Sequence, residues 1–271
     1  MFRLKNILFL VLIALTTSAC EDVIDVDLPS EEPRLVIDAL IRIPEQEGQE
    51  ETVLAFIKLT TTAPFYDEQV PIVTGANATL NTGNKSYDLT DQSNGFYTAY
   101  IPREEIENEV FTLKVEYNNE VYSSTTKYVP TVPIDFIGQG DSTLFSGDER
   151  EVIVIYTDPA ESDDYYLFDL DYKLFLVSED EFYQGQTFGF SYFYEDLSVG
   201  ASITIDILGV DKNFYDYMNT VINQAGRDTG GPFESPPATL RGNIVNTTNP
   251  DNFALGYFAI AQEYSANIVL E

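Results

Sequence analysis

Residues 110–129, with the sequence VFTLKVEYNNEVYSSTTKYV, give the clearest local signal in this chain of 271 residues. The apolar and aromatic side chains there are Phe111, Leu113, Val115 and Tyr117. They alternate with polar side chains, as in a half-buried β-strand. Asn118 and Asn119 follow, and asparagine tolerates the positive φ angles that a two-residue hairpin turn requires. The stretch therefore predicts two antiparallel strands joined by a tight turn.

Short β-branched runs recur before and after this hairpin, and turn-forming residues separate them. They occupy residues 34–41, 51–62, 151–157, 165–177, 186–194, 201–208, 240–246 and 253–264. The run at 165–177 alternates without a break and predicts one strand with five side chains on one face: Phe168, Leu170, Tyr172, Leu174 and Leu176. Strands this short and this regularly spaced predict a mainly β protein of two β-sandwich-like domains.

A proline-containing junction, VPTVP at residues 129–133, stiffens the backbone and indicates the domain boundary. We expect an immunoglobulin-like or transthyretin-like β-sandwich at residues 33–130 and a β-rich domain at residues 131–271. Gly75-Ala76 and residues 94–97 resemble the transthyretin-like, carboxypeptidase-regulatory type of module.

One helix is expected in the second domain, at residues 211–226. Asp211 suits the N-cap position, and Gly226 suits the C-terminal stop. Six apolar side chains fall on one helical face, which predicts a helix packed on a sheet: Phe214, Tyr217, Met218, Val221, Ile222 and Ala225.

The N-terminus has the order of a secretory signal, with basic residues, nine apolar residues at 7–15 and then small residues up to Ala19. Nine residues are too few to cross about 30 Å of hydrocarbon. Ala19-Cys20 resembles the lipobox of bacterial lipoproteins, in which the chain is cleaved before a cysteine that carries acyl chains such as palmitate. Cys20 is the only cysteine, so no disulfide explains it. We expect a signal peptide at 1–19 and lipidation of Cys20; the alternative is an ordinary signal peptide with a chance cysteine.

An acidic tether follows at residues 20–32 and resembles the surface-export signal of some lipoproteins; a plain solvated tether is the alternative. Removing residues 1–19, which carry two basic and no acidic side chains, changes the formal net charge from −31 to −33. A chain this acidic repels nucleic acid, so no nucleic-acid partner is expected. It also repels anionic lipid, so the N-terminal lipid must provide the attachment to the membrane.

The composition disfavours most enzyme classes. The chain has no histidine and no cysteine beyond Cys20, so the usual general base and thiol nucleophile are missing. It has no Gly-x-Ser-x-Gly elbow and no glycine-rich phosphate loop. A carboxylate pair of the glycosidase kind stays open, because 45 acidic residues supply pairs by chance. We therefore assign no catalytic residue, no cofactor and no enzymatic activity.

One acidic loop, DPAESDDYY at residues 158–166, could supply oxygen ligands to calcium. Its acidic side chains are Asp158, Glu161, Asp163 and Asp164. Their spacing is not that of an EF-hand, and charge runs are usually solvated. We therefore predict no metal site and keep calcium as the weaker alternative.

The order of several motifs resembles the domain-of-unknown-function 4249 (DUF4249) family of exported outer-membrane lipoproteins. The motifs are LVIDALI at 35–41, GANATL at 75–80, GFYTAY at 95–100 and PPATLRGNIVNTTNPDNFALGYFAIA at 236–261. The resemblance implies a two-part, mostly β protein, often encoded near TonB-dependent outer-membrane transporters, with no established catalytic residues. Within the last motif, Gly256 indicates close backbone approach, and the aromatic residues after it indicate core packing.

These observations predict a non-enzymatic outer-membrane lipoprotein that faces the cell surface. We expect it to act as a binding or accessory subunit of a TonB-dependent transporter in nutrient uptake. The alternative is a structural or adhesive envelope protein without a small ligand, and a carboxylate-based hydrolase is a weaker third hypothesis. The sequence does not assign the ligand-binding residues.

Overall fold

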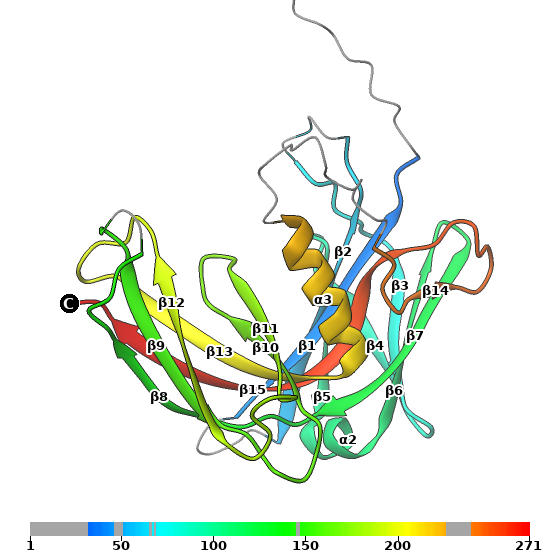
Figure 1. Cartoon of the computed structure of the whole chain (residues 1–271). Helices are drawn as coiled ribbons and strands as arrows, with labels where there is room; N and C mark the ends of the chain where they lie inside the picture. Colours follow the sequence, from blue (N-terminus) through cyan, green and yellow to red (C-terminus); the bar gives the residue numbers. More distant parts are fainter. Residues whose placement is uncertain (1–31, 46–50, 65–66, 68, 145–146, 226–239) are drawn as a thin grey trace, which may run out of the picture. The chain divides into compact units, whose positions relative to one another are not determined.

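The protein is described by a computed structural model that covers residues 32–45, 51–64, 67, 69–144, 147–225 and 240–271. Residues 33–271 form one compact unit (Figure 1). Ala19, Cys20 and the acidic residues 21–31 lie outside the described residues, so the expected cleavage and lipidation remain predictions.

Eight strands close into a barrel-like sheet in the order β15-β1-β2-β5-β4-β3-β6-β7, and β7 pairs back onto β15. Neighbours are antiparallel except at β15, which runs parallel to both β1 and β7. Alternate residues of these strands form one apolar core, which includes Ile37, Leu59 and Phe111. The strands are β1 (Leu35–Pro44), β2 (Thr52–Thr61), β3 (Asn77–Asn81), β4 (Ser86–Asp91), β5 (Phe96–Pro102), β6 (Val110–Tyr117), β7 (Glu120–Val129) and β15 (Leu255–Val269).

The expected hairpin at residues 110–129 is confirmed as β6 and β7. Tyr117 pairs with Glu120, and the two turn residues have the predicted left-handed backbone, with φ of 50° at Asn118 and 62° at Asn119. A short helix, α2 (Arg103–Asn108), precedes β6 and was not expected from the sequence. Ile106 is its buried residue, so it offers little of the apolar periodicity that identifies a helix.

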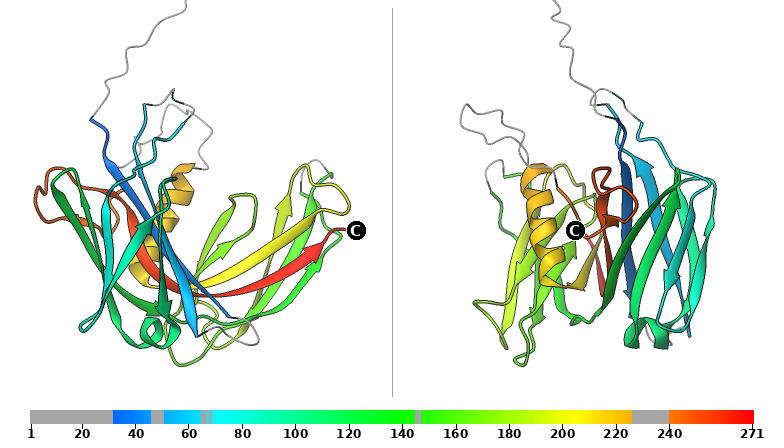
Figure 2. Two further views of the ribbon diagram at one scale, coloured as in Figure 1. Left: turned by 180° about the vertical axis from the view of Figure 1, so that it is seen from behind. Right: turned by 90° about the vertical axis from the view of Figure 1, so that its right-hand side faces the viewer.

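The remaining strands build a second layered body on the same chain. The C-terminal half of β15 leaves the barrel and pairs with β13 (Ser202–Val210), followed by β10 (Tyr165–Asp169) and β11 (Phe175–Glu179). Figures 1 and 2 show β15, coloured red, curving from the barrel strands to lie beside β13. A separate sheet shares an aromatic-rich core with these strands: β8 (Ile134–Gln139), β9 (Arg150–Thr157) and β12 (Thr187–Tyr194).

The mainly β prediction is confirmed, but the arrangement differs from two β-sandwich-like domains. The VPTVP junction lies between β7 and β8, where the chain leaves the barrel strands. The barrel strands of residues 33–130, however, close only through the N-terminal half of β15. Phe258 and Ile260 from that strand belong to the barrel core. Long-range parallel pairing of this kind leaves no local sequence signal.

The strand expected at residues 165–177 is wrong, because the chain reverses within it to form β10 and β11. Asp171, Tyr172 and Lys173 all have positive φ, at 64°, 49° and 64°. The side chains of Asp169 and Asp171 accept hydrogen bonds from backbone N–H groups inside the turn, which stabilises this conformation. Phe168 and Leu176 pair across the hairpin, so they still share one face, which hid the turn in the sequence pattern. The run at 240–246 likewise gives only the two-residue strand β14 (Val245–Asn246), paired with β7.

The predicted helix is confirmed as α3 (Lys212–Ala225). Asp211 is its N-cap, since its Oδ1 accepts a hydrogen bond of 2.8 Å from the backbone N–H of Phe214. Gly226 lies outside the described residues. The apolar face of α3 packs on β10, β13 and β15, on the side opposite the barrel core. Among the helices of the described residues, none has the length and apolar character needed to cross a membrane.

Candidate ligand-binding site

A cavity of about 730 Å³ lies between α3 and the sheet formed by β1, β15 and β10. It exists because β1 alternates its side chains between two faces. Odd-numbered residues such as Ile37 belong to the barrel core, whereas the even-numbered residues line the cavity: Val36, Asp38, Leu40 and Arg42. The other walls are mainly apolar and come from α3, β15, β2 and β11. Concave, mainly apolar sites with a few polar groups are the usual form of a small-molecule site.

Aromatic rings form the wall between α3 and β15. The ring of Tyr257 lies 5.1 Å from that of Tyr217 and 4.9 Å from that of Phe214, the latter edge to face. Phe214 and Tyr257 are buried, whereas Tyr217 is half-buried at the cavity. Burial raises the pKa of Tyr217, and the nearby charge of Asp38 raises it further. Tyr217 is therefore a neutral phenol whose ring is available to a ligand.

Asp38 places a carboxylate on the floor of this cavity. Its side chain is accessible to solvent, yet the surrounding protein atoms raise its pKa. The charge of Lys58, its register partner on β2, opposes that rise. Within the described residues the two side chains form no ion pair, and the Lys58 amine lies over the ring of Phe96, 5.6 Å from its centroid.

Arg42 lies on the same face of β1, at the centre of a four-residue charge cluster. Its Nη1 contacts Oδ2 of Asp169 at 2.8 Å, and its other nitrogens bind Asp206 and Glu263. The three acids come from β10, β13 and β15, so the cluster joins four strands that are neighbours in one sheet. Burial acts to lower the pKa of Arg42, but hydrogen bonds and charges of the three acids outweigh it and raise the pKa. Oδ1 of Asp206 is buried without a hydrogen-bond partner among the described residues.

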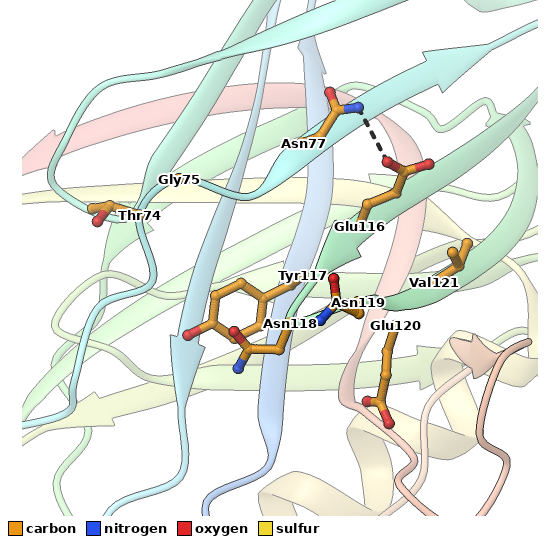
Figure 3. A pocket seen from close by; sticks show the side chains of 9 residues that line it. All are labelled: Thr74, Gly75, Asn77, Glu116, Tyr117, Asn118, Asn119, Glu120 and Val121. Atoms are coloured by element: carbon orange, nitrogen blue, oxygen red, sulfur yellow. Dashed lines mark hydrogen bonds between the residues drawn. The ribbon is translucent and has the colours of Figure 1, made fainter.

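A second, more open depression of about 640 Å³ lies beside the β6–β7 turn (Figure 3). Asn77 and Glu116 meet across it through a hydrogen bond of 3.4 Å. Glu120 also lines it, but its carboxylate already accepts hydrogen bonds from Tyr122, Asn246, Asn249 and Asn252. The hydrogen bond from Tyr122 contributes most to lowering the pKa of Glu120. This carboxylate therefore holds the loop after β14, and the cavity under α3 is the better ligand site.

Of the four acids in the loop at residues 158–166, the structure brings only two together in an arrangement that could hold calcium. The structure brings Asp158 and Asp164 together with Asp180, which sequence reasoning missed, and one oxygen from each lies within 4.8 Å of the others. Glu161 and Asp163 are not part of that group. Asp158 and Asp180 are buried, so their carboxylates are not solvated. Asp158 accepts hydrogen bonds from the Tyr166 hydroxyl and the Gly185 N–H, and Asp180 accepts one from the Asp164 N–H.

Asp164→Asn tests whether the three carboxylates bind a cation, or whether the negative charge of Asp164 only destabilises the folded state. Burial raises the pKa of Asp164, and the charges of Asp158 and Asp180 add to the rise, so ionisation of Asp164 disfavours the folded state. We expect Asp164→Asn to raise the Tm by about 1–2 °C at neutral pH. The gain should vanish as the pH falls and the wild-type carboxyl becomes protonated. We expect a chelator to leave the wild-type Tm unchanged; a chelator-dependent fall that Asp164→Asn abolishes would show that a cation is bound.

Two solved structures are distantly similar to this chain. A DUF4785 family protein from Legionella pneumophila subsp. pneumophila is similar at 14% identity and a TM-score of 0.25, over 65% of this chain and 52% of that one. A structure of a bacterial ice-binding adhesin, described for host cell surface retention, is similar at 10% identity and a TM-score of 0.23, over 90% of this chain and 65% of that one. The chain thus spans about half of the first protein's length and about two thirds of the second's. Among curated proteins, no match was found.

The family comparison covers nearly all of the chain. The model described as domain of unknown function (DUF4249) matches residues 21–267. This range contains α3, both walls of the cavity and the four residues of the charge cluster around Arg42. The match confirms the resemblance carried by residues 236–261. The chain therefore belongs to the DUF4249 family.

Proposed function

We propose that this chain is a non-enzymatic binding subunit that serves a TonB-dependent transporter in nutrient uptake at the bacterial outer membrane. The observation that carries the proposal is the cavity under α3, whose size and mainly apolar walls suit a small molecule. Its aromatic wall and its polar floor lie on separate elements, so a ligand can be both enclosed and oriented.

In this proposal the N-terminus would attach the protein to the membrane. Cleavage after Ala19 would leave Cys20 as the first residue of an acylated chain, with the acidic residues 21–32 as a tether towards the folded unit. Several acyl chains anchor a protein firmly, whereas a single chain binds a membrane only marginally. The family match begins at residue 21, which is consistent with a mature chain that starts at Cys20.

A tagged purification from detergent-solubilised outer membranes tests the proposal. We expect a TonB-dependent transporter to co-purify in stoichiometric amount, because an uptake subunit must deliver its ligand to the channel. The Cys20→Ala variant is the control: it should leave the membrane pellet and lose the transporter. Recovery of the protein alone would favour the structural or adhesive alternative, and detergent-dependent pelleting of Cys20→Ala would contradict lipidation.

A further inference from the structure

The polar end of the cavity under α3 carries an excess of negative charge. Asp38 and Asp169 line it, and Asp206 and Glu263 lie beside them in the Arg42 cluster. Arg42 is the cation of that cluster, and its Nε, Nη1 and Nη2 atoms each already donate to one acid. An incoming anion would therefore meet three carboxylates around one occupied guanidinium. Like charges at such close range disfavour an anionic ligand.

Asp38 is the acid that a ligand can reach. It is exposed to solvent at the cavity and forms no ion pair within the described residues, while the surrounding protein atoms limit its hydration and raise its pKa. The apolar walls disfavour the ionised form of the Asp38 carboxylate, and a bound cation would stabilise that form. Lys58 supplies part of that charge, but its amine lies over Phe96. The position in front of Asp38 is thus suited to a cationic group.

The aromatic wall points to the same chemistry. Tyr217 lines the same cavity as Asp38, and its ring belongs to the group with Phe214 and Tyr257. An ammonium group next to a carboxylate and an aromatic face gains both ion pairing and cation–π attraction. The apolar walls beyond, which include Leu40, Met218 and Val221, suit a hydrocarbon or aromatic body.

We propose that the cavity under α3 binds an apolar or aromatic amine, with the ammonium group at Asp38 and the apolar body against α3. This inference rests on the proposed function, since it names the ligand class of the same cavity. It assigns Asp38 as the specificity residue and Tyr217 as the aromatic partner of the cation. It also assigns Lys58 as an internal competitor for the Asp38 carboxylate.

Equilibrium dialysis with three matched probes tests the inference on the full mature chain carrying Cys20→Ala, which removes the lipid without shortening the chain. The probes are 1-naphthylmethylamine, 1-naphthalenemethanol and 1-naphthoate, which share one ring system and differ in charge. Salt at about 0.15 M screens the exposed charges of this acidic protein. We expect one amine molecule to bind per chain, about tenfold tighter than the alcohol, with naphthoate weakest.

Variants separate the cavity from the acidic surface. Asp38→Asn should weaken amine binding about tenfold and change alcohol binding less than about twofold, because only the charge is removed. Asp88→Asn is the matched control, since Asp88 is also an exposed aspartate on a strand, β4, and lies outside this cavity. It should leave both affinities unchanged. Lys58→Gln should tighten amine binding, because it removes the competing cation.

The outcomes separate this inference from the proposed function. Equal binding of amine and alcohol, or equal weakening of the amine by Asp38→Asn and Asp88→Asn, would overturn the amine inference. Saturable alcohol binding in that case would leave the cavity as a binding site and the proposed function intact. Binding of none of the three probes would overturn the inference as well, while co-purification of the transporter would still support the accessory role.

Discussion

Arg42→Met is expected to lower the free energy of unfolding by about 3 kcal/mol, because it leaves three acids facing one another without their cation. The Arg42 side chain is 26% exposed, and those of Asp169, Asp206 and Glu263 are 20%, 14% and 12% exposed. This partial exposure places the effect at the lower end of the range for buried charge pairs. Urea denaturation followed by far-ultraviolet circular dichroism measures it, since the chain has no tryptophan.

The pH dependence of this loss distinguishes charge repulsion from lost packing. Burial raises the pKa of Glu263, Arg42 opposes the rise, and Asp206 and Asp169 add to it. Without Arg42, carboxyl groups in this cluster have higher pKa values in the folded state than in the unfolded state. Their protonation on acidification then relieves the repulsion, so the difference from the wild type should shrink as the pH falls. A loss independent of pH would contradict the electrostatic account.

A surface ion pair gives the control for Arg42→Met. Lys114 and Glu116 are neighbours on β6, and their side chains are 45% and 41% exposed. Exposed pairs of this kind contribute roughly 0–1 kcal/mol, so Lys114→Met should change stability little. A similar loss in both variants would show that the Arg42 cluster has no special role in joining its four strands.

Gly256→Ala is expected to destabilise the fold by about 3 kcal/mol or more, because two backbones approach too closely at Gly256 for a side chain. Gly256 pairs with Ile37 across the parallel β1–β15 contact, and its φ is +98°. A Cβ atom at this position would lie 2.0 Å from the Ile37 carbonyl oxygen and 2.7 Å from its carbonyl carbon. Backbone atoms cannot rotate away, so β1 and β15 would have to separate.

Gly200→Ala is the matched control for this prediction. Gly200 has a φ of +88°, but a Cβ there would have no heavy atom within 4 Å. Gly200→Ala should therefore lower the free energy of unfolding only by the cost of an alanine at positive φ, about 1 kcal/mol. Thermal and urea denaturation of both variants separate the two contributions, and equal losses would contradict the close approach. Gly242 reinforces the constraint, since a Cβ there would lie 1.6 Å from the Gly256 carbonyl oxygen.

Local features of the fold were predictable because their causes lie within a few residues. The left-handed turn at Asn118 and Asn119, the N-cap at Asp211 and the close approach at Gly256 each follow from one residue type in one backbone setting. The β10–β11 turn was missed because Asp171, Tyr172 and Lys173 adopt positive φ without glycine or asparagine. The side chains of Asp169 and Asp171 stabilise this turn by accepting backbone hydrogen bonds. The alternation of apolar and polar residues does not reveal those hydrogen bonds.

The candidate site was not predictable, because its walls are far apart in the sequence. Arg42 and Glu263 are 221 residues apart, and no local pattern links them. The only signal was a pair of charged residues, Asp38 and Arg42, inside an otherwise apolar strand at even spacing. That spacing places both on the face opposite the barrel core, but it does not indicate that α3 covers that face. Asp180 was missed for the same reason, since it meets Asp158 and Asp164 only after the β10–β11 hairpin forms.

The shared strand β15 determines the order in which this chain can complete its fold. β1 and β7 each pair with β15 as a parallel neighbour, and β13 pairs with its other half, yet β15 follows all of these strands in the sequence and is synthesised after them. Until then, two edges of the barrel strands stay unpaired and open to association with other chains. Because both bodies need the same strand, we expect them to fold and unfold as one cooperative unit.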